Sequence, residues 1–178
     1  MIIRFLYIAI LLNLFSCGTS NNKPPNVIVI ISDDQGYADV GFHGSNEIFT
    51  PNIDRIAKNG VVFSEGYVSY AVCSPSRAGL ITGRYQNRFG YSRNILLAPN
   101  DSLMGLPLSE QTLPDVLNNV DYKTKAIGKW HLGDNYPYRP EDRGFDETLW
   151  FPSSHINSAG DFWDNDYFDD TFMVNGKR

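Results

Sequence analysis

Apolar residues in this chain occur either in short continuous runs or at helical spacings. The run Val27–Ile31 is continuous and largely β-branched, which is typical of a strand buried on both faces of a parallel or mixed sheet. Residues 61–69 form a second apolar stretch that Gly66 interrupts, and residues 122–133 read as a strand leading into a glycine-rich turn. The pattern therefore predicts three strands, separated by segments with a different period.

Residues 50–60 carry the start and stop signals of a helix. Thr50 can cap the first turn, Pro51 suits the first helical position, and Gly60 follows the last apolar residue. We therefore predict a helix between the first and second strands.

Two further helices are predicted at residues 76–82 and 109–120. In the later one, Thr112 and Asp115 have the spacing of a capping box. Strands and helices then alternate along the chain, which indicates an α/β fold. The turn-rich, aromatic sequence beyond Pro137 shows no clear period, so no element is predicted there.

The first residues have the pattern of an export signal. The apolar run Phe5–Phe15 is too short to span a bilayer and has the length of a signal-peptide core. With Cys17 after it, the segment resembles a bacterial lipoprotein signal, in which the cysteine is lipidated after cleavage. An ordinary secretory signal with an incidental cysteine is the alternative. We expect a signal peptide at 1–16, a tether at 17–25, and an exported protein that is periplasmic or anchored in the outer membrane through Cys17.

Composition places residues 26–178 in one globular domain or in part of a larger one. Of the 178 residues, 42% are hydrophobic and 13% are aromatic, and no segment is of low complexity. The formal net charge of -5 gives no support to nucleic-acid binding, which usually leaves a basic footprint.

The chain has only two cysteines. If Cys17 carries lipid, Cys73 has no disulfide partner within the chain. A lone thiol in an oxidising compartment is a liability unless it is buried or chemically altered. A buried structural cysteine therefore stands as the alternative to a reactive one.

Three groups of polar residues fall at predicted strand ends or helix starts. Asp33 and Asp34 follow the first strand, and adjacent carboxylates suit a hard divalent cation. Cys73 begins the "CSPSR" segment ahead of a helix. Lys129 and His131 follow the later strand. The carboxyl ends of strands are where ligands bind in open α/β sheets, so these residues form a candidate site; a solvated turn is the alternative for the two aspartates.

Arg77 and the pair Lys129 and His131 bring positive charge to this candidate site. Arg77 lies one helical turn after Cys73, where free backbone N–H groups also favour an anion. In an extended segment, Lys129 and His131 point to the same face. A cation beside an imidazole suits anion binding and proton transfer. A surface salt bridge is the alternative for Arg77.

Residues 71–83 resemble the signature of the type I sulfatases, in the alkaline-phosphatase-like superfamily. The matching positions are Cys73, Pro75, Ser76, Arg77, Leu80, Ile81, Thr82 and Gly83. The second signature of that family resembles residues 122–131, at Thr124, Gly128, Lys129 and His131, with Asp121 in place of the usual glycine. The resemblance implies a mixed, mostly parallel central sheet flanked by helices, of which this chain is the N-terminal part.

The resemblance also implies a modified nucleophile. In this family the cysteine at the position of Cys73 is oxidised by a maturation enzyme to Cα-formylglycine, and Pro75 and Arg77 match the recognition sequence for that conversion. One hydroxyl of the hydrated aldehyde attacks the sulfate sulfur and expels the alcohol. The other hydroxyl then loses its proton, and collapse to the aldehyde ejects sulfate. A serine could form the covalent intermediate, but it has no second hydroxyl whose deprotonation would release the sulfate.

A divalent cation, calcium by resemblance, would be held by Asp33, Asp34 and the oxygen of the modified Cys73. There it would act as a Lewis acid on a sulfate oxygen. Arg77 would orient the modified side chain and offset charge.

The remaining implied roles concern the sulfate. By resemblance, Lys129 would bind the sulfate. His131 would assist proton transfer at the second hydroxyl of the hydrated aldehyde. Ser154 lies in a Ser-His segment that matches one in the family, so it would hydrogen-bond the sulfate; His155 is the weaker match.

The expected substrate is a sulfated polysaccharide or its oligosaccharides. Family members are much longer, and their later ligands, an Asp followed by Asn or Gln, a second histidine and a second lysine, have no counterpart here. We therefore expect the 178-residue chain to show no sulfate-ester hydrolysis by itself. A phosphatase or phosphodiesterase of the same superfamily is the first alternative. A noncatalytic glycan-binding lipoprotein, using the aromatic and acidic stretch 161–170, is the second.

Overall fold

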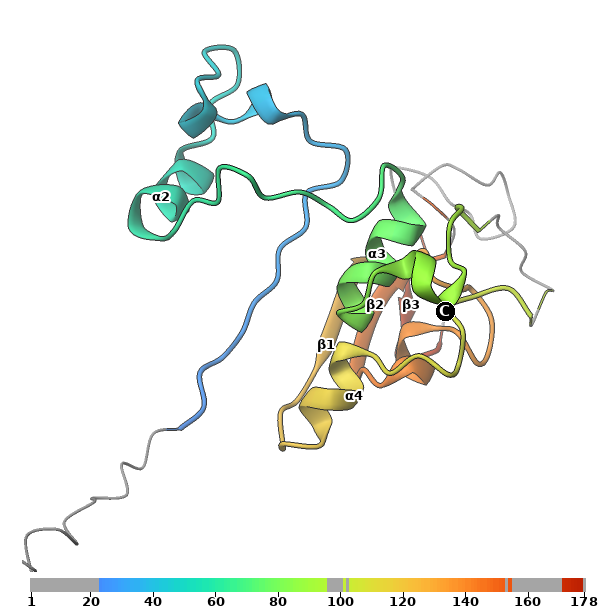
Figure 1. The fold of residues 1–178 in the computed structure, drawn as a ribbon. Coiled ribbons are helices and arrows are strands. Elements are labelled where there is room, and N and C mark those ends of the chain that lie inside the picture. The colour runs from blue at the N-terminus through green and yellow to red at the C-terminus, as the bar shows by residue number, and fades with distance from the viewer. Residues whose placement is uncertain (1–22, 96–100, 102, 153, 155–170, 178) are drawn as a thin grey trace, which may run out of the picture. The chain divides into compact units, whose positions relative to one another are not determined.

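The structure is a computed structural model that describes residues 23–95, 101, 103–152, 154 and 171–177 (Figure 1). The chain divides into two units, Met1–Gly36 and Tyr37–Arg178. The predicted signal peptide and the start of the tether lie outside the described residues. No helix among those described has the length and apolar character needed to cross a bilayer.

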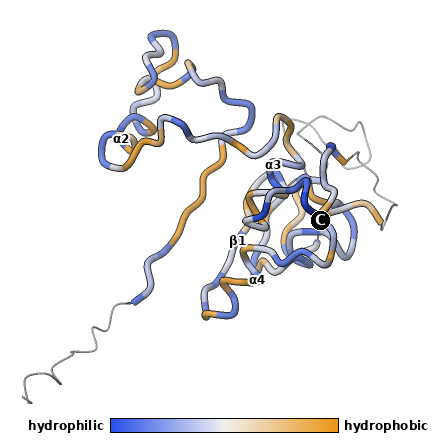
Figure 2. Tube along the Cα trace, in the orientation of Figure 1, coloured by the Kyte–Doolittle hydropathy of each residue, from blue (hydrophilic) through white to orange (hydrophobic). Residues whose placement is uncertain are grey.

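The described part of the first unit contains no strand. Val27–Ile31 is an uninterrupted hydrophobic stretch (Figure 2), and its side chains are between 50% and 83% exposed. The predicted buried strand is therefore wrong for this structure. A strand of that composition is stabilised by neighbours on both sides, and no described strand pairs with this run.

Helix α2 (Pro51–Asn59) confirms the helix that the sequence predicts at residues 50–60. Two 3-10 helices, η1 (Tyr37–Asp39) and η2 (Gly41–His43), precede it. Thr50 does not cap α2 in the usual way. Its hydroxyl donates to Asp54 Oδ1 over 3.0 Å and accepts the Gly41 N–H over 2.8 Å, so it ties η2 to the helix. Asp54 Oδ1 also accepts the Phe42 N–H.

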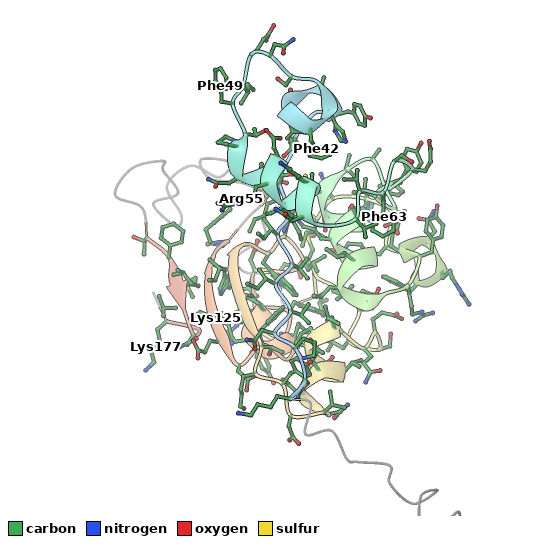
Figure 3. The ribbon with its side chains drawn as sticks, turned by 90° about the vertical axis from the view of Figure 1, so that its left-hand side faces the viewer. Phe42, Phe49, Arg55, Phe63, Lys125 and Lys177 are labelled. Carbon is green, nitrogen blue, oxygen red and sulfur yellow. The ribbon has the colours of Figure 1, made fainter. Side chains whose placement is uncertain are left out.

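Residues 61–69 form no strand, so the second predicted strand is also wrong. Val61 and Val68 are exposed. Phe63 is exposed as well, as is Phe49 ahead of α2 (Figure 3). β-branched and aromatic residues favour a strand only where a neighbouring strand and an apolar surface receive them.

The sheet is mixed and has the order β1-β2-β3. Strands β1 (Lys125–Lys129) and β2 (Glu147–Phe151) are parallel, with Lys125 opposite Glu147 and Lys129 opposite Phe151. Strand β3 (Met173–Val174) pairs antiparallel with β2. The third predicted strand is confirmed as β1, whereas β2 and β3 lie where no element is predicted. Helices and a mixed sheet together confirm the α/β class.

Helix α3 (Cys73–Thr82) lies against the sheet (Figure 1) and contributes Ala78 and Ile81 to the core. The other core residues come from the sheet and from the segments around it: Tyr91, Leu106, Trp130, Leu132, Trp150 and Met173. Gly83 ends α3 in the left-handed region with φ 61°, a conformation that glycine adopts without strain. The 3-10 helix η3 (Gln86–Phe89) follows and packs Phe89 on the same core.

Helix α4 (Leu113–Asn118) confirms the third predicted helix and its capping box. Thr112 Oγ accepts the Asp115 N–H, and the Asp115 side chain accepts the Thr112 N–H. The same hydroxyl reaches the carbonyl of Arg143, at the end of the 3-10 helix η4 (Pro140–Arg143). The cap therefore also joins α4 to the segment that leads into β2.

Asp146, just ahead of β2, links the start of β2 to the segment before β1. Its carboxylate accepts from Lys123 Nζ over 2.8 Å and from the Thr124 N–H over 2.9 Å. These hydrogen bonds, with Lys123 the largest contribution, lower the pKa of Asp146 from 3.8 to about 2. The charged carboxylate is thus favoured in the folded protein.

Asp146→Asn is expected to flatten the acid side of the stability curve. Because the folded pKa is depressed, the stabilisation by Asp146 is present above pH 3.8 and is lost as pH falls toward about 2. Urea midpoints measured through this window should fall in the parent chain and change less in the variant. The exposed Glu47→Gln variant is the control and should follow the parent; parallel curves for all three chains would contradict the assignment.

Candidate active site

Cys73 is the first residue of α3, at the point where the extended chain turns into a helix. Val72 before it is extended, with φ -127° and ψ 160°. The Cys73 thiol is free and partly exposed, whereas Ser74 and Pro75 are buried. The predicted position at a helix start is confirmed, although the helix begins at Cys73 and not at Ser76. The buried neighbours anchor the helix start and leave the thiol at its surface.

The start of α3 is held by residues that sequence reasoning missed. Asn94 Oδ1 accepts the Ser74 N–H over 3.0 Å, and the Tyr91 hydroxyl lies 2.8 Å from Ser74 Oγ. Burial raises the pKa of Tyr91 to about 12, so this group is a neutral hydroxyl near neutral pH. No motif marks these two residues, because they contact the helix only through the tertiary fold.

Arg77 connects the Cys73 helix to the sheet. Its Nη1 donates to the backbone carbonyl of Lys129, at the end of β1, over 2.7 Å. Two segments that are 52 residues apart along the chain are thereby brought together, with a guanidinium at the backbone of a lysine. The structure thus unites two of the three groups of polar residues that the sequence singles out.

The sequence predicts that Lys129 and His131 point to the same face of one extended segment. The structure differs, because the two residues do not lie in one strand. Strand β1 ends at Lys129, and His131 has a left-handed backbone with φ 59°. Lys129 is partly buried, whereas His131 is only 2% exposed. His131 Nε2 lies 3.2 Å from the Ile95 carbonyl, which can only accept, so Nε2 carries a proton in this contact. The turn, and not the strand, orients the imidazole.

The predicted carboxylate ligands lie in the first unit. Asp33 and Asp34 are both exposed and form a bend, and Asp34 has φ 53°. Two adjacent carboxylates offer the oxygen donors that a hard divalent cation prefers, so the donor chemistry fits calcium.

The remaining predicted residues lie at or beyond the edge of what is described. Ser154 is partly buried and follows β2 by a few residues. Cys17, His155 and the stretch 161–170 lie outside the described residues.

The arrangement in the second unit suits an oxyanion. A side chain at the start of a ten-residue helix experiences the positive end of the helix dipole. Arg77 adds a cation where that helix meets the end of β1, at the backbone of Lys129. Cys73 lies in this field, and His131 follows Lys129 by two residues in the chain.

The family model of the sulfatases matches residues 25–175. Human N-acetylgalactosamine-6-sulfatase is 40% identical over 140 residues, which cover 75% of this chain and 27% of the relative. Arylsulfatase G of Canis lupus familiaris is 41% identical over 138 residues, covering 78% of this chain and 25% of the relative.

Solved structures show the same likeness. The crystal structure of Ps i-CgsB has a TM-score of 0.70 at 46% identity and covers 76% of this chain and 30% of its own. The structure of BT4656 in complex with its substrate D-glucosamine-2-N,6-O-disulfate has a TM-score of 0.65 at 32% identity and covers 87% and 27%.

The chain spans between a quarter and a third of the length of these relatives. Its small mixed sheet and helices correspond to part of their alkaline-phosphatase-like fold. The family model covers most of the chain, including Cys73, Arg77, Lys129 and His131. This chain belongs to the sulfatase family.

Proposed function

We propose that this chain forms the N-terminal part of the catalytic domain of a sulfuric ester hydrolase that removes sulfate from a sulfated carbohydrate. The observation that carries the proposal is the hydrogen bond from Arg77 Nη1 to the Lys129 carbonyl, because it joins the two sulfatase signatures at one place. The carbohydrate class is supported by relatives named for an N-acetylgalactosamine sulfate and by a neighbour bound to a sulfated glucosamine.

Cys73 is the proposed precursor of the nucleophile. Its partly exposed thiol follows an extended residue at a helix start, and its neighbours Pro75 and Arg77 complete the recognition sequence that the family resemblance implies. Oxidised to formylglycine by a maturation enzyme, the side chain supplies a hydrated aldehyde with two hydroxyls on one carbon. Arg77, fixed on the Lys129 carbonyl, orients this side chain and offsets negative charge.

Asp33 and Asp34 are the proposed protein ligands of one calcium ion, together with the oxygen of the modified Cys73. The donor set contains only hard oxygens, which suits calcium better than a soft metal. When bound, the ion supplies Lewis-acid polarisation of a sulfate oxygen.

Lys129, His131 and Ser154 are the proposed sulfate and proton-transfer residues. Lys129 binds the sulfate as a point charge, and Ser154 donates a hydrogen bond to it. The Ile95 carbonyl keeps a proton on His131 Nε2, so Nδ1 is the ring atom that takes up or gives the proton in the reaction.

Export is part of the proposal. The apolar run Phe5–Phe15 and Cys17 support a signal peptide with a lipid anchor on the membrane, and an exported enzyme meets sulfated polysaccharides outside the cytoplasm.

Conversion of Cys73 is the direct test of this function. The chain is co-expressed with a formylglycine-generating enzyme, and the Cys73 peptide is analysed by mass spectrometry and by labelling with an aldehyde-reactive hydrazide. We expect the aldehyde in the parent chain and in Cys17→Ser, and none in Cys73→Ala or Arg77→Ala. The readout needs no turnover by the 178-residue chain.

An unmodified Cys73 thiol in the presence of an active maturation enzyme would contradict the proposal and favour a noncatalytic glycan-binding lipoprotein. Hydrolysis of an aryl phosphate in preference to an aryl sulfate would favour a phosphatase or phosphodiesterase of the same superfamily. Robust sulfate release by the 178 residues alone would refute the expectation that the chain needs the later part of the family's catalytic domain.

A further inference from the structure

One short segment contacts both signature segments. Residues 91–95, which follow η3, accept the Ser74 N–H at Asn94 Oδ1 and contact Ser74 Oγ through the Tyr91 hydroxyl. The Ile95 carbonyl of the same segment accepts from His131 Nε2. The residue beside Cys73 and the imidazole of His131 are therefore both bound to one five-residue stretch.

This segment is itself fixed in place. Tyr91 is buried in the core, and its N–H donates to the Gln86 carbonyl over 3.0 Å. The Ser92 carbonyl accepts from the Tyr70 hydroxyl over 2.7 Å. These contacts give the segment a defined position from which Asn94 can act on the helix.

Helix α3 needs an outside acceptor at its start. The first N–H groups of a helix have no acceptor within the helix, and Val72 makes no side-chain cap bond. Asn94, 20 residues away along the chain, supplies that acceptor to Ser74. The Ser74 contact and the His131 contact are thus made by adjacent residues, Asn94 through its side chain and Ile95 through its carbonyl.

We propose that Asn94 is a positioning residue, whose side-chain carbonyl sets the start of α3, and hence Cys73, in register with His131. This inference rests on the proposed function, which assigns the chemistry to Cys73 and His131. Asn94 touches neither the substrate nor the reacting atoms; it acts through Ser74 and through the adjacent Ile95 carbonyl.

The test compares Asn94→Ala, Asn94→Asp and the control Asn87→Ala in the 178-residue chain labelled with ¹⁵N. Asn87 is also exposed but donates only a local side-chain bond, to the Tyr85 hydroxyl. We expect Asn94→Ala to raise the amide exchange rate of Ser74 by about fivefold. This factor corresponds to the free energy that is usually lost when a helix cap is removed. The side-chain ¹⁵N signal of His131 should move in the same variant. Asn94→Asp should match the parent, because a carboxylate also accepts and suits a helix start.

Either of two results in the variants would overturn the inference. Faster Ser74 exchange with an unmoved His131 signal would reduce Asn94 to a helix cap, and an Asn94→Asp variant as impaired as the alanine variant would refute the acceptor role. If Asn94→Ala does not fold, the test is made on the parent chain. There we would measure the scalar coupling across the hydrogen bond between the Ser74 amide and the Asn94 side-chain carbonyl. Absence of that coupling refutes the proposal.

None of these readouts uses the aldehyde or turnover. A failure of Cys73 conversion therefore counts against the proposed function, and a failure of the Asn94 experiment counts against the positioning role alone.

Discussion

Replacing Arg143 with alanine is expected to lower the free energy of unfolding of the second unit by about 3 kcal/mol. Arg143 is only 5% exposed, and burial lowers the pKa of its guanidinium. Its Nη1 donates to the Leu106 carbonyl over 2.6 Å, and its Nη2 donates to the Glu110 carbonyl over 2.8 Å. Alanine would leave these acceptors without a donor and open a cavity beside them.

Urea unfolding followed by far-UV circular dichroism measures this loss. Arg139→Ala is the matched control, because Arg139 is more exposed and pairs with Asp142 within the same turn. It should cost less than about 1 kcal/mol, as surface ion pairs do. Arg143→Lys keeps the charge but replaces the two donor nitrogens of the guanidinium by one, so its cost should fall between the two. Equal losses for Arg143→Ala and Arg139→Ala would show that the buried hydrogen bonds contribute little.

The consequence of losing Arg143 reaches the candidate site. The Leu106 N–H donates to the Leu132 carbonyl over 2.8 Å, and Leu132 follows His131. Arg143 holds the Leu106 carbonyl on the other side of the same residue. The variant should therefore also broaden the His131 side-chain signal before the unit unfolds.

Trp150→Ala is expected to cost about 4 kcal/mol, because it removes a large side chain from the middle of β2. Trp150 is 1% exposed and belongs to the same core cluster as Ala78, Leu132 and Met173. Its Nε1–H donates to Glu141 Oε2 over 3.1 Å, which ties the strand to η4. The variant would lose apolar contacts and leave Glu141 with fewer donors.

Neighbouring variants separate these two contributions in the same urea experiment. Trp150→Phe keeps most of the apolar volume and loses the N–H, so a smaller cost of about 1–2 kcal/mol is expected. Leu149→Ala lies next to it on the opposite face, where Leu149 is 37% exposed, and should cost less than about 1 kcal/mol. A Leu149→Ala loss as large as that of Trp150→Ala would place the core on the wrong face of β2.

Helices were predictable because their signals are local. Thr112 and Asp115 form the capping box that their spacing predicts, and Pro51 and Gly60 mark the ends of α2. A capping bond needs only residues within one turn, so the sequence alone contains the required partners.

Strands were less predictable, since a strand requires a partner strand, and that partner is often distant in the sequence. Val27–Ile31 has a strong strand pattern but no described pairing, whereas β3, only two residues long, carries no pattern at all. Strand β2 alternates buried and exposed positions at Thr148, Leu149 and Trp150, yet it stands in a turn-rich stretch that obscures this period.

For the candidate site, the sequence names a set of residues and no geometry. Motif resemblance singles out Cys73, Arg77, Lys129 and His131. The bond from Arg77 to the Lys129 backbone, the left-handed turn at His131 and the Asn94 contact all arise from tertiary packing.

The exposure of Val27–Ile31 has a consequence for the aggregation of this protein. Five consecutive apolar residues without a charge or proline have the composition of segments that stack into cross-β aggregates. Strand β1, at the edge of the described sheet, offers a second template for pairing between molecules. The yield of the 178-residue chain should therefore fall as its concentration rises, because contacts between copies of this stretch become more frequent.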